Sequence, residues 1–227
     1  MRILVISDIH ANYEALESVI ADAGAVDETW CLGDIVGYGP DPNLCVEVVR
    51  ELPNLTCLLG NHDAAILGRM PLAAFNGEAR RSLDLQSRVL NADNVAFLRS
   101  LPDSTLTNGA VTLAHGSPRD PTWEYVLNTL SARLNFDYFT TPFCFVGHAH
   151  LQCMFQLDEK RDRVSMEVPP PGEVVEMTPR AIFNPGSVGQ PRDRDPRASY
   201  AIYNPIARTW EPRRVEYDIP AVQARIR

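Results

Sequence analysis

The first 60 residues alternate between short apolar runs and longer amphipathic stretches. Residues 2–6 (RILVI) form a continuous apolar run rich in β-branched residues, which predicts a strand buried on both faces. Two further runs, at residues 29–33 (TWCLG) and 55–60 (LTCLLG), predict strands as well. Because helical stretches join these strands over short connections, we expect a parallel sheet built from right-handed crossovers.

The amphipathic stretches predict helices with recognisable starts. Asn12 can cap a first helix, whose apolar face carries Tyr13, Leu16, Val19 and Ile20. Asp41 followed by Pro42 indicates the start of a second helix, which Pro53 stops. The predicted buried face of this second helix consists of Leu44, Cys45, Val48, Val49 and Leu52.

The rest of the chain has a helical part followed by a strand-rich part. Residues 64–101 have a helical pattern, with Asn76 as a plausible cap and a stripe of Ala79, Leu83, Gln86 and Leu90. Apolar segments separated by turn residues then favour strands, and we expect one α/β domain over residues 1–227. Residues 158–177 are charged and then proline-rich, which predicts a solvated hairpin or loop. A contact with another subunit or with the substrate rim is the alternative interpretation.

Composition and charge limit the kinds of molecule that the protein is expected to bind. The 227 residues are 45% hydrophobic and 22% charged, with a formal net charge of -8, so there is no general attraction to a nucleic-acid polymer or an anionic membrane. A phosphate substrate would therefore need a local source of positive charge, which a bound metal could supply. No apolar run approaches the ~20 residues of a membrane span. Five cysteines without CxxC spacing predict buried thiols in a reducing compartment, and we expect a cytoplasmic protein whose oligomeric state is left open.

Every histidine of the chain follows the end of a predicted strand, and most lie beside glycine or aspartate. In open α/β sheets this edge is where ligands bind. Buried carboxylates and imidazoles are costly unless a cation neutralises them, so a cluster of this size predicts a metal site. The polar residues at the strand ends are Asp8, His10, Asp34, Asn61, His62, Asp63, His115, His148 and His150.

The donor set indicates which metals would bind. Carboxylate, imidazole and one amide oxygen, without thiolate, suit Mn²⁺, Fe, Zn²⁺ or Co²⁺, with Mn²⁺ favoured. Seven ligands are too many for one tetrahedral zinc but fit two ions that share a bridging carboxylate, an arrangement used for phosphoryl displacement. The seven predicted ligands are Asp8, His10, Asp34, Asn61, His115, His148 and His150.

The blocks DIH, GD, GNHD, AHG and GHAH, in this order over residues 8–150, resemble the signature of the calcineurin-like metallophosphoesterases. The segment 184–192 (NPGSVGQPR) is similar to the closing segment of small bacterial YfcE-like phosphodiesterases. The resemblance implies an α/β/β/α sandwich with two mixed sheets between helices. It also implies one ion on Asp8, His10 and His150, another on Asn61, His115 and His148, and Asp34 as the bridge.

The resemblance further implies in-line attack on phosphorus by a hydroxide between the ions, with His62 as the acid or the stabiliser of the transition state. An ordinary histidine pKa of ~6.5 suits this role. Two interpretations of Asp63 stand side by side: it orients His62, or it is a carboxylate favoured at a helix N-terminus. Asn12, Ser187 and Arg192 are further candidates for substrate contacts.

Three functions remain open at this point. The first is hydrolysis of small phosphodiesters or nucleotides, including dinucleoside polyphosphates. The second is a serine/threonine protein phosphatase, but the arginine of the GDxVDRG motif is absent from GDIVGYG; Arg192, Arg80 and Arg81 are candidate substitutes. The third is a non-catalytic scaffold of the same fold, like some retromer-subunit relatives, which should lack several of the histidines that are present here.

Overall fold

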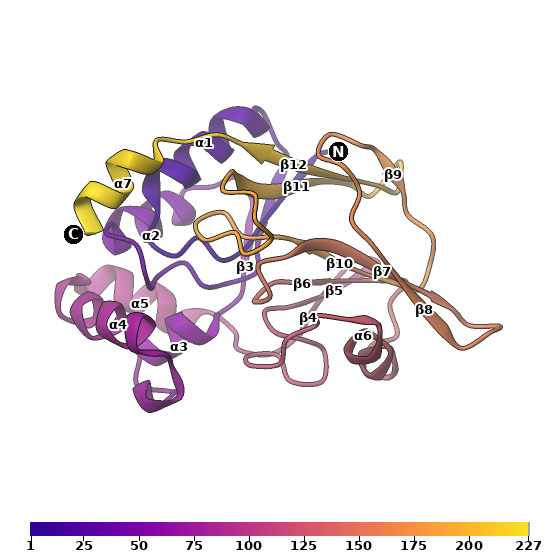
Figure 1. The fold of residues 1–227 in the computed structure, drawn as a ribbon, viewed down its shortest axis with the longest axis horizontal. Helices are drawn as coiled ribbons and strands as arrows, with labels where there is room; N and C mark the ends of the chain where they lie inside the picture. Colours follow the sequence, from indigo (N-terminus) through magenta and orange to yellow (C-terminus); the bar gives the residue numbers. More distant parts are fainter. Residues whose placement is uncertain (227) are drawn as a thin grey trace.

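The computed structural model of the chain describes residues 1–226 as two six-stranded sheets with helices on their outer faces (Figure 1). The first sheet has the order β3-β2-β1-β11-β12-β9 and the second β4-β5-β6-β10-β7-β8. The strands are β1 (Ile3–Ile6), β2 (Glu28–Cys31), β3 (Leu55–Cys57), β4 (Leu106–Asn108), β5 (Val111–Ala114), β6 (Phe143–Val146), β7 (Gln152–Asp158), β8 (Arg163–Glu167), β9 (Val175–Glu176), β10 (Ala181–Pro185), β11 (Ala198–Asn204) and β12 (Thr209–Val215).

The helices follow the predicted starts closely. Asn12 caps α1 by accepting a hydrogen bond from Ala15 N, and Asn76 caps α4 in the same way through Ala79 N. Pro42 is the first residue of α2. The helices are α1 (Tyr13–Ala23), α2 (Pro42–Arg50), α3 (Asn61–Ile66), α4 (Gly77–Val89), α5 (Ala92–Ser100), α6 (Thr129–Asn135) and α7 (Ile219–Ile226), with short 3-10 turns at Leu72–Ala74 and Phe136–Tyr138.

One predicted face needs correction. Leu44 was expected on the buried side of α2, but it is 40% exposed, and Val46 is fully buried instead. The reason is the rotation that the neighbouring sheet imposes: α2 turns Cys45, Val46 and Val49 inward. The sequence alone left two overlapping apolar stripes on this short helix, and packing selected one of them.

Three hydrophobic clusters hold the layers together. One joins the first sheet to α1 and α2, a second lies between the sheets, and a third joins the second sheet to α6. The inter-sheet cluster includes Trp30 and Tyr203 from the first sheet and Phe145 and Phe183 from the second. These packed layers confirm the predicted α/β/β/α sandwich.

The strand pairings explain why the carboxyl ends of several strands lie together. The β1–β2 and β2–β3 pairs are parallel, as predicted, and so are β5–β6 and β6–β10. Parallel neighbours bring their carboxyl ends to the same edge. The polar residues that follow β1 and β2 therefore lie at one edge of the first sheet, and those that follow β5 and β6 lie at one edge of the second.

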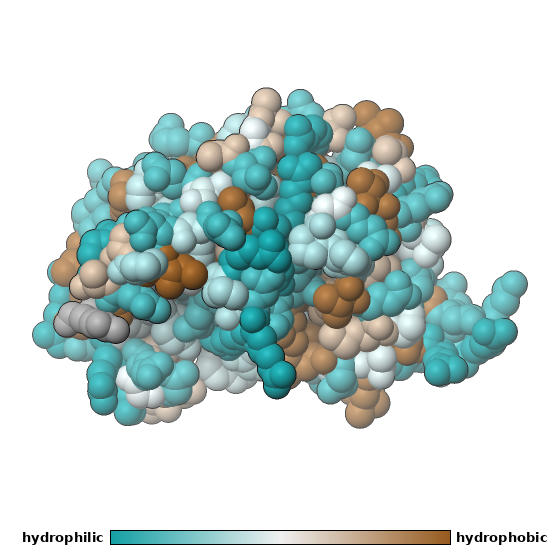
Figure 2. Space-filling model, turned by 45° about the horizontal axis from the view of Figure 1, so that its top comes forward, coloured by the Kyte–Doolittle hydropathy of each residue, from teal (hydrophilic) through white to brown (hydrophobic). Residues whose placement is uncertain are grey.

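The outer surface is mostly polar. The β7–β8 hairpin projects from the sandwich, in agreement with the expectation for residues 158–177, although Val175 and Glu176 join the first sheet as β9 (Figure 1). On the face drawn in Figure 2, hydrophobic residues form several separate groups between hydrophilic ones. All five cysteines are buried and free, and no helix within residues 1–226 is long and apolar enough to cross a membrane.

Candidate metal centre

The seven residues predicted as metal ligands converge at the carboxyl edges of the two sheets. Each of them is at most 3% exposed. They come from the loops after β1, β2, β5 and β6 and from the first residue of α3, which follows β3. Segments as far apart in sequence as Asp8 and His150 thus supply one compact, buried cluster. The residues are Asp8, His10, Asp34, Asn61, His115, His148 and His150.

Five of these residues have left-handed backbone conformations, with φ between 51° and 60°. Side chains other than glycine rarely adopt this region, and such strain collects at functional sites when the surroundings enforce it. Here neighbouring loops enforce it, because Asp8 N donates to Gly33 O and His10 N donates to Asp34 O, both at 3.0 Å. The five residues are Asp8, His10, Asp34, His148 and His150.

Each aspartate is fixed through one oxygen and leaves the other without a partner. Asp34 Oδ1 accepts from His62 N at 2.8 Å, and Asp8 Oδ2 accepts from His148 N at 3.0 Å. Asp34 Oδ2 and Asp8 Oδ1 are buried and accept no hydrogen bond from any described residue. Buried carboxylate oxygens of this kind are costly unless a cation binds them. The two unpartnered carboxylate oxygens therefore indicate that these residues are suited to bind metal ions.

The imidazoles are oriented by their outer nitrogens. In three of them Nδ1–H donates to a backbone carbonyl at 2.6–3.0 Å, which turns Nε2 toward the cluster. His148 is turned the other way, with Nε2 3.1 Å from Trp123 O, so that Nδ1 faces the cluster. Hydrogen bonding of the outer nitrogen is the usual way in which proteins orient metal-binding imidazoles. The three with Nδ1 bonds are His10, His115 and His150.

The ligand atoms divide into two groups, each within 4.8 Å. Asp8, His10 and His150 make one group, with His150 Nε2 3.2 Å from Asp8 Oδ1. Asp34, His115 and His148 make the other. Asp34 Oδ2 lies 3.6 Å from His115 Nε2 and 3.8 Å from His10 Nε2, between the groups.

This grouping is the one implied by the family resemblance. Asn61 Oδ1 lies 2.9 Å from His115 Nε2, at the second group. A third set of ligand atoms, from His10, Asp34 and His62, overlaps both groups, so His62 also lies within reach of a cation.

The protonation states suit cations. Burial lowers the pKa of His10, His115 and His148, so their imidazoles are neutral at pH 7 and keep a lone pair for a metal. Burial, with Asp63 and Asp8 close by, raises the pKa of Asp34. A cation between the groups would reverse this effect and ionise Asp34.

His62 lies beside the cluster in a tight site. Its ring centroid is 4.7 Å from that of His10, and a Cβ on Gly37 would lie 2.2 Å from its Nδ1. Burial, with His115 and His150 nearby, lowers the pKa of His62 to about 3. The pKa of His62 is thus shifted down from the unperturbed value of ~6.5, and the protein's own groups keep its imidazole neutral at pH 7.

The Asp63 carboxylate makes no hydrogen bond to the His62 ring, whose Nδ1 has no partner among the described residues. The carboxylate accepts hydrogen bonds at 2.9–3.1 Å from the backbone N–H groups of Asp34, Val36 and Gly60. Of the two interpretations of Asp63, the hydrogen bonds match the helix N-terminus, because Gly60 is the N-cap of α3. The same carboxylate also ties the loop after β2 to α3, which the sequence did not reveal.

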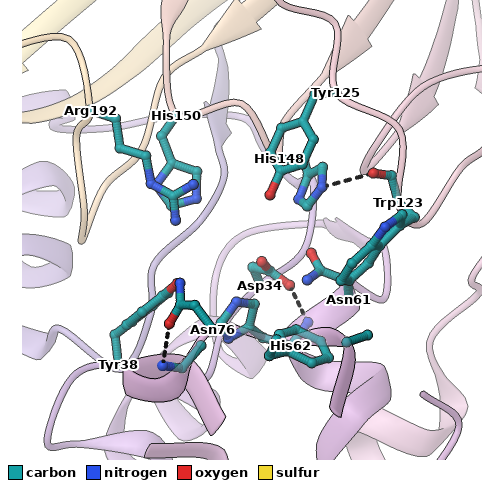
Figure 3. A pocket seen from close by; sticks show the side chains of 13 residues that line it. Asp34, Tyr38, Asn61, His62, Asn76, Trp123, Tyr125, His148, His150 and Arg192 are labelled. Carbon is teal, nitrogen blue, oxygen red and sulfur yellow. Dashed lines mark hydrogen bonds between the residues drawn. The ribbon is translucent and has the colours of Figure 1, made fainter. Parts of the chain in front are cut away.

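A cavity of about 110 Å³ opens beside the cluster (Figure 3). Its floor includes Asp34, Asn61 and His62, and Arg192 lies at its edge near His150. Four aromatic side chains and Asn76 also line the cavity, and the sequence did not indicate any of them as a site residue. They come from irregular loops, where no periodicity marks them. The only signals in the sequence are the segments GYG and TWEY, which place aromatic residues in predicted loops. The aromatic residues are Tyr38, Phe75, Trp123 and Tyr125.

The three candidate substrate contacts have different outcomes. Arg192 lines the cavity, whereas Arg80 and Arg81 on α4 are exposed elsewhere. Ser187 is fully buried, donates to Asp8 O and accepts from Gln190 N, so it supports the loop and is not free for substrate. Asn12 uses both polar atoms of its amide within the fold. Its Oδ1 caps α1, and its Nδ2 donates to Gly189 O.

The comparisons with known proteins agree with this geometry. The family model for the calcineurin-like phosphoesterase superfamily domain matches residues 1–205. A metallophosphoesterase structure from Sphaerobacter thermophilus has 50% identity and a TM-score of 0.91, covering 100% of this chain and 92% of that one. An uncharacterized protein of Methanocaldococcus jannaschii is 37% identical over 99% of this chain and 91% of its own length.

A more limited similarity involves the symmetrical bis(5'-nucleosyl)-tetraphosphatase of Erwinia tasmaniensis. It is 36% identical over 100 residues, which is 42% of this chain and 35% of that protein. The full-length family match, together with a buried carboxylate and imidazole cluster at the sheet edges, confirms the resemblance inferred from the sequence blocks. The chain belongs to the calcineurin-like phosphoesterase superfamily, and as such is a metal-dependent hydrolase that acts on phosphoester bonds.

Proposed function

We propose that this protein uses two divalent cations, with Mn²⁺ favoured, to hydrolyse small phosphodiesters or nucleotide-type phosphate esters. The observation that carries the proposal is the pair of ligand groups around Asp34, with one buried oxygen of Asp34 and one of Asp8 left without a hydrogen bond. Asp8, His10 and His150 would hold one ion. Asn61, His115 and His148 would hold the other, with Asp34 between them.

Bound divalent cations would lower the pKa of a water molecule and neutralise charge on the phosphate, which supports in-line displacement at phosphorus. The chain supplies the orientation of the substrate. Arg192 places a guanidinium at the cavity edge, where it can bind a phosphate oxygen. The neutral His62 imidazole can donate a hydrogen bond to an oxygen of the phosphate or of the leaving group. Its role needs no imidazolium.

The cavity favours a small substrate with an aromatic group. The ring centroids of Phe75 and Trp123 lie 5.3 Å apart in an edge-to-face arrangement, and that of Tyr125 lies 3.8 Å from that of His148 in a stacked one. Flat aromatic surfaces therefore surround the phosphate site. Dinucleoside polyphosphates are the second candidate, supported by the 100-residue similarity to a bis(5'-nucleosyl)-tetraphosphatase. A phosphoprotein substrate has less support, because Gly37, Tyr38 and Gly39 stand in the loop where protein phosphatases carry their arginine.

A substrate panel tests the proposal. The purified protein, loaded with Mn²⁺, is assayed with bis-p-nitrophenyl phosphate, diadenosine tetraphosphate, cyclic nucleotides and a phosphopeptide. We expect hydrolysis of the diester or the dinucleotide well above that of the phosphopeptide, and loss of activity with EDTA. Preference for the phosphopeptide would contradict the substrate class. Failure to hydrolyse any ester in the presence of bound metal would favour the non-catalytic scaffold.

A further inference from the structure

A second cavity, of about 160 Å³, lies directly beside the metal centre. Tyr38 lines both cavities, and the predicted metal ligand His10 lines the second. The loop that carries Arg192 contributes as well, because Gly189 and Gln190 line the second cavity while Arg192 lines the first. Two separate spaces therefore adjoin the same cluster of ligands.

The two cavities differ in charge. The first contains Asp34, His62 and Arg192, which suit a phosphate and its cations. The second has no aspartate, glutamate, lysine or arginine among its lining residues. Its outer wall consists of one aromatic ring, three aliphatic side chains and one amide, which are Tyr217, Ile219, Val222, Ile226 and Gln223. Such a lining suits a neutral, flat group that has a hydrogen-bonding edge.

The wall of the second cavity is a fixed part of the fold. It consists mainly of α7, which lies beside α1 and α2 (Figure 1). Arg225 of α7 pairs with Glu14 of α1 and donates to Asp41, the N-cap of α2, at 2.6 Å. Val222 is 5% exposed. The cavity is thus bounded by an anchored helix, close to the position where a phosphate would lie.

We infer that the second cavity is a binding site for the second organic group of a two-ended phosphoester, such as an aryl group or a nucleobase. The inference builds on the proposed function. One group of the substrate lies against Phe75, Trp123 and Tyr125 in the first cavity, the phosphate lies at the metal centre, and the other group passes Tyr38 toward α7. This arrangement favours phosphoesters with ring groups on both sides of phosphorus over those with one.

The test uses two diesters with the same leaving group. Bis-p-nitrophenyl phosphate carries a ring on both sides, and methyl p-nitrophenyl phosphate carries one. Gln223→Trp places a bulky ring in the second cavity at an exposed helix position, so folding is not at risk. Ala224→Trp is the matched control, because Ala224 is also exposed on α7 but does not line the cavity.

We expect Gln223→Trp to lower the ratio of kcat/KM for the bis-aryl over the methyl diester about tenfold, while Ala224→Trp keeps the wild-type ratio. Binding of diphenyl phosphate, measured by calorimetry, should weaken by a similar factor in Gln223→Trp only. Equal ratios and equal binding in both variants would overturn the second site while leaving the proposed function intact. Absence of hydrolysis in the wild type would instead overturn the proposed function.

Discussion

Asp34 is the residue on which both ligand groups depend. Its Oδ1 is held by the backbone N–H of His62, and its unpartnered Oδ2 lies between imidazoles of the two groups. Asp34→Asn keeps an oxygen for the His62 bond but removes the charge that two cations would share. We expect loss of bound metal and of activity together, with the fold preserved. Metal analysis of the purified variant checks this, and a variant that keeps both ions would show that Asp34 is not the bridge.

His62 contributes differently, because its backbone supports Asp34 while its ring faces the cavity. His62→Ala keeps the backbone bond and removes only the ring. We expect turnover to fall by ~10²–10⁴ while metal content stays normal. The measurement is steady-state kinetics on metal-loaded protein, alongside metal analysis. Loss of metal in this variant would instead make His62 a ligand, as its position near His10 and Asp34 allows.

At the scale of elements, the loops after β2 and β3 are joined through Asp63. Its carboxylate accepts three backbone N–H bonds, and it is fully buried. In Asp63→Asn, an amide NH₂ would face at least one of those donors. We expect the free energy of unfolding to fall by about 1–3 kcal/mol for each N–H left without an acceptor, as measured by urea unfolding. Metal affinity should fall too, because Asp34 N is among these donors.

Asp93→Asn is the matched control for this effect. Asp93 also lies in the first turn of a helix, α5, but it is exposed. Loss of a favourable helix-terminus charge costs only about 0.3–1 kcal/mol. Equal destabilisation by the two substitutions would show that the charge at the helix terminus, and not the buried hydrogen bonds, accounts for the contribution of Asp63.

For the whole molecule, burial of this cluster predicts acid sensitivity of the metal-free protein. Four histidines have lowered pKa values, so the unfolded chain binds protons below pH 6.5 that the folded chain does not. Asp34 and Asp63 oppose this, because their pKa values are raised, that of Asp63 to about 6. Because these histidines outnumber the two carboxyl groups, the unfolded chain takes up more protons than the folded chain as pH falls. The four histidines are His10, His62, His115 and His148.

Each additional proton bound by the unfolded chain lowers stability by about 1.4 kcal/mol per pH unit, so we expect the metal-free protein to become less stable as pH falls from 6.5 to 5. Urea unfolding of EDTA-treated protein at fixed pH measures this loss. Added Mn²⁺ should raise stability at pH 6.5 and move the loss to lower pH, because bound cations exclude protons from the imidazoles. Constant stability of the metal-free protein over this range would contradict the prediction.

The sequence by itself determined the local elements and the chemistry of the cluster. The strand at Ile3–Ile6, the helix caps at Asn12 and Asn76 and the polar residues after the strands follow from periodicity and capping, which depend on neighbouring residues only. Parallel pairing then brings neighbouring strand ends to one edge within each sheet. The α/β class and the clustering of polar residues at strand ends could be predicted in this way, whereas the two-sheet sandwich and the division of the ligands between two ions came only from the family resemblance.

The tertiary structure decided everything that depends on which loops lie face to face. It turned Leu44 outward, placed the Asp63 carboxylate against backbone N–H donors, and engaged the Ser187 hydroxyl in hydrogen bonds to the neighbouring backbone. It also surrounded the phosphate site with aromatic side chains and placed α7 beside His10 to form a second cavity. No pattern along the chain records these contacts, because they join irregular segments whose separation in sequence carries no periodic signal.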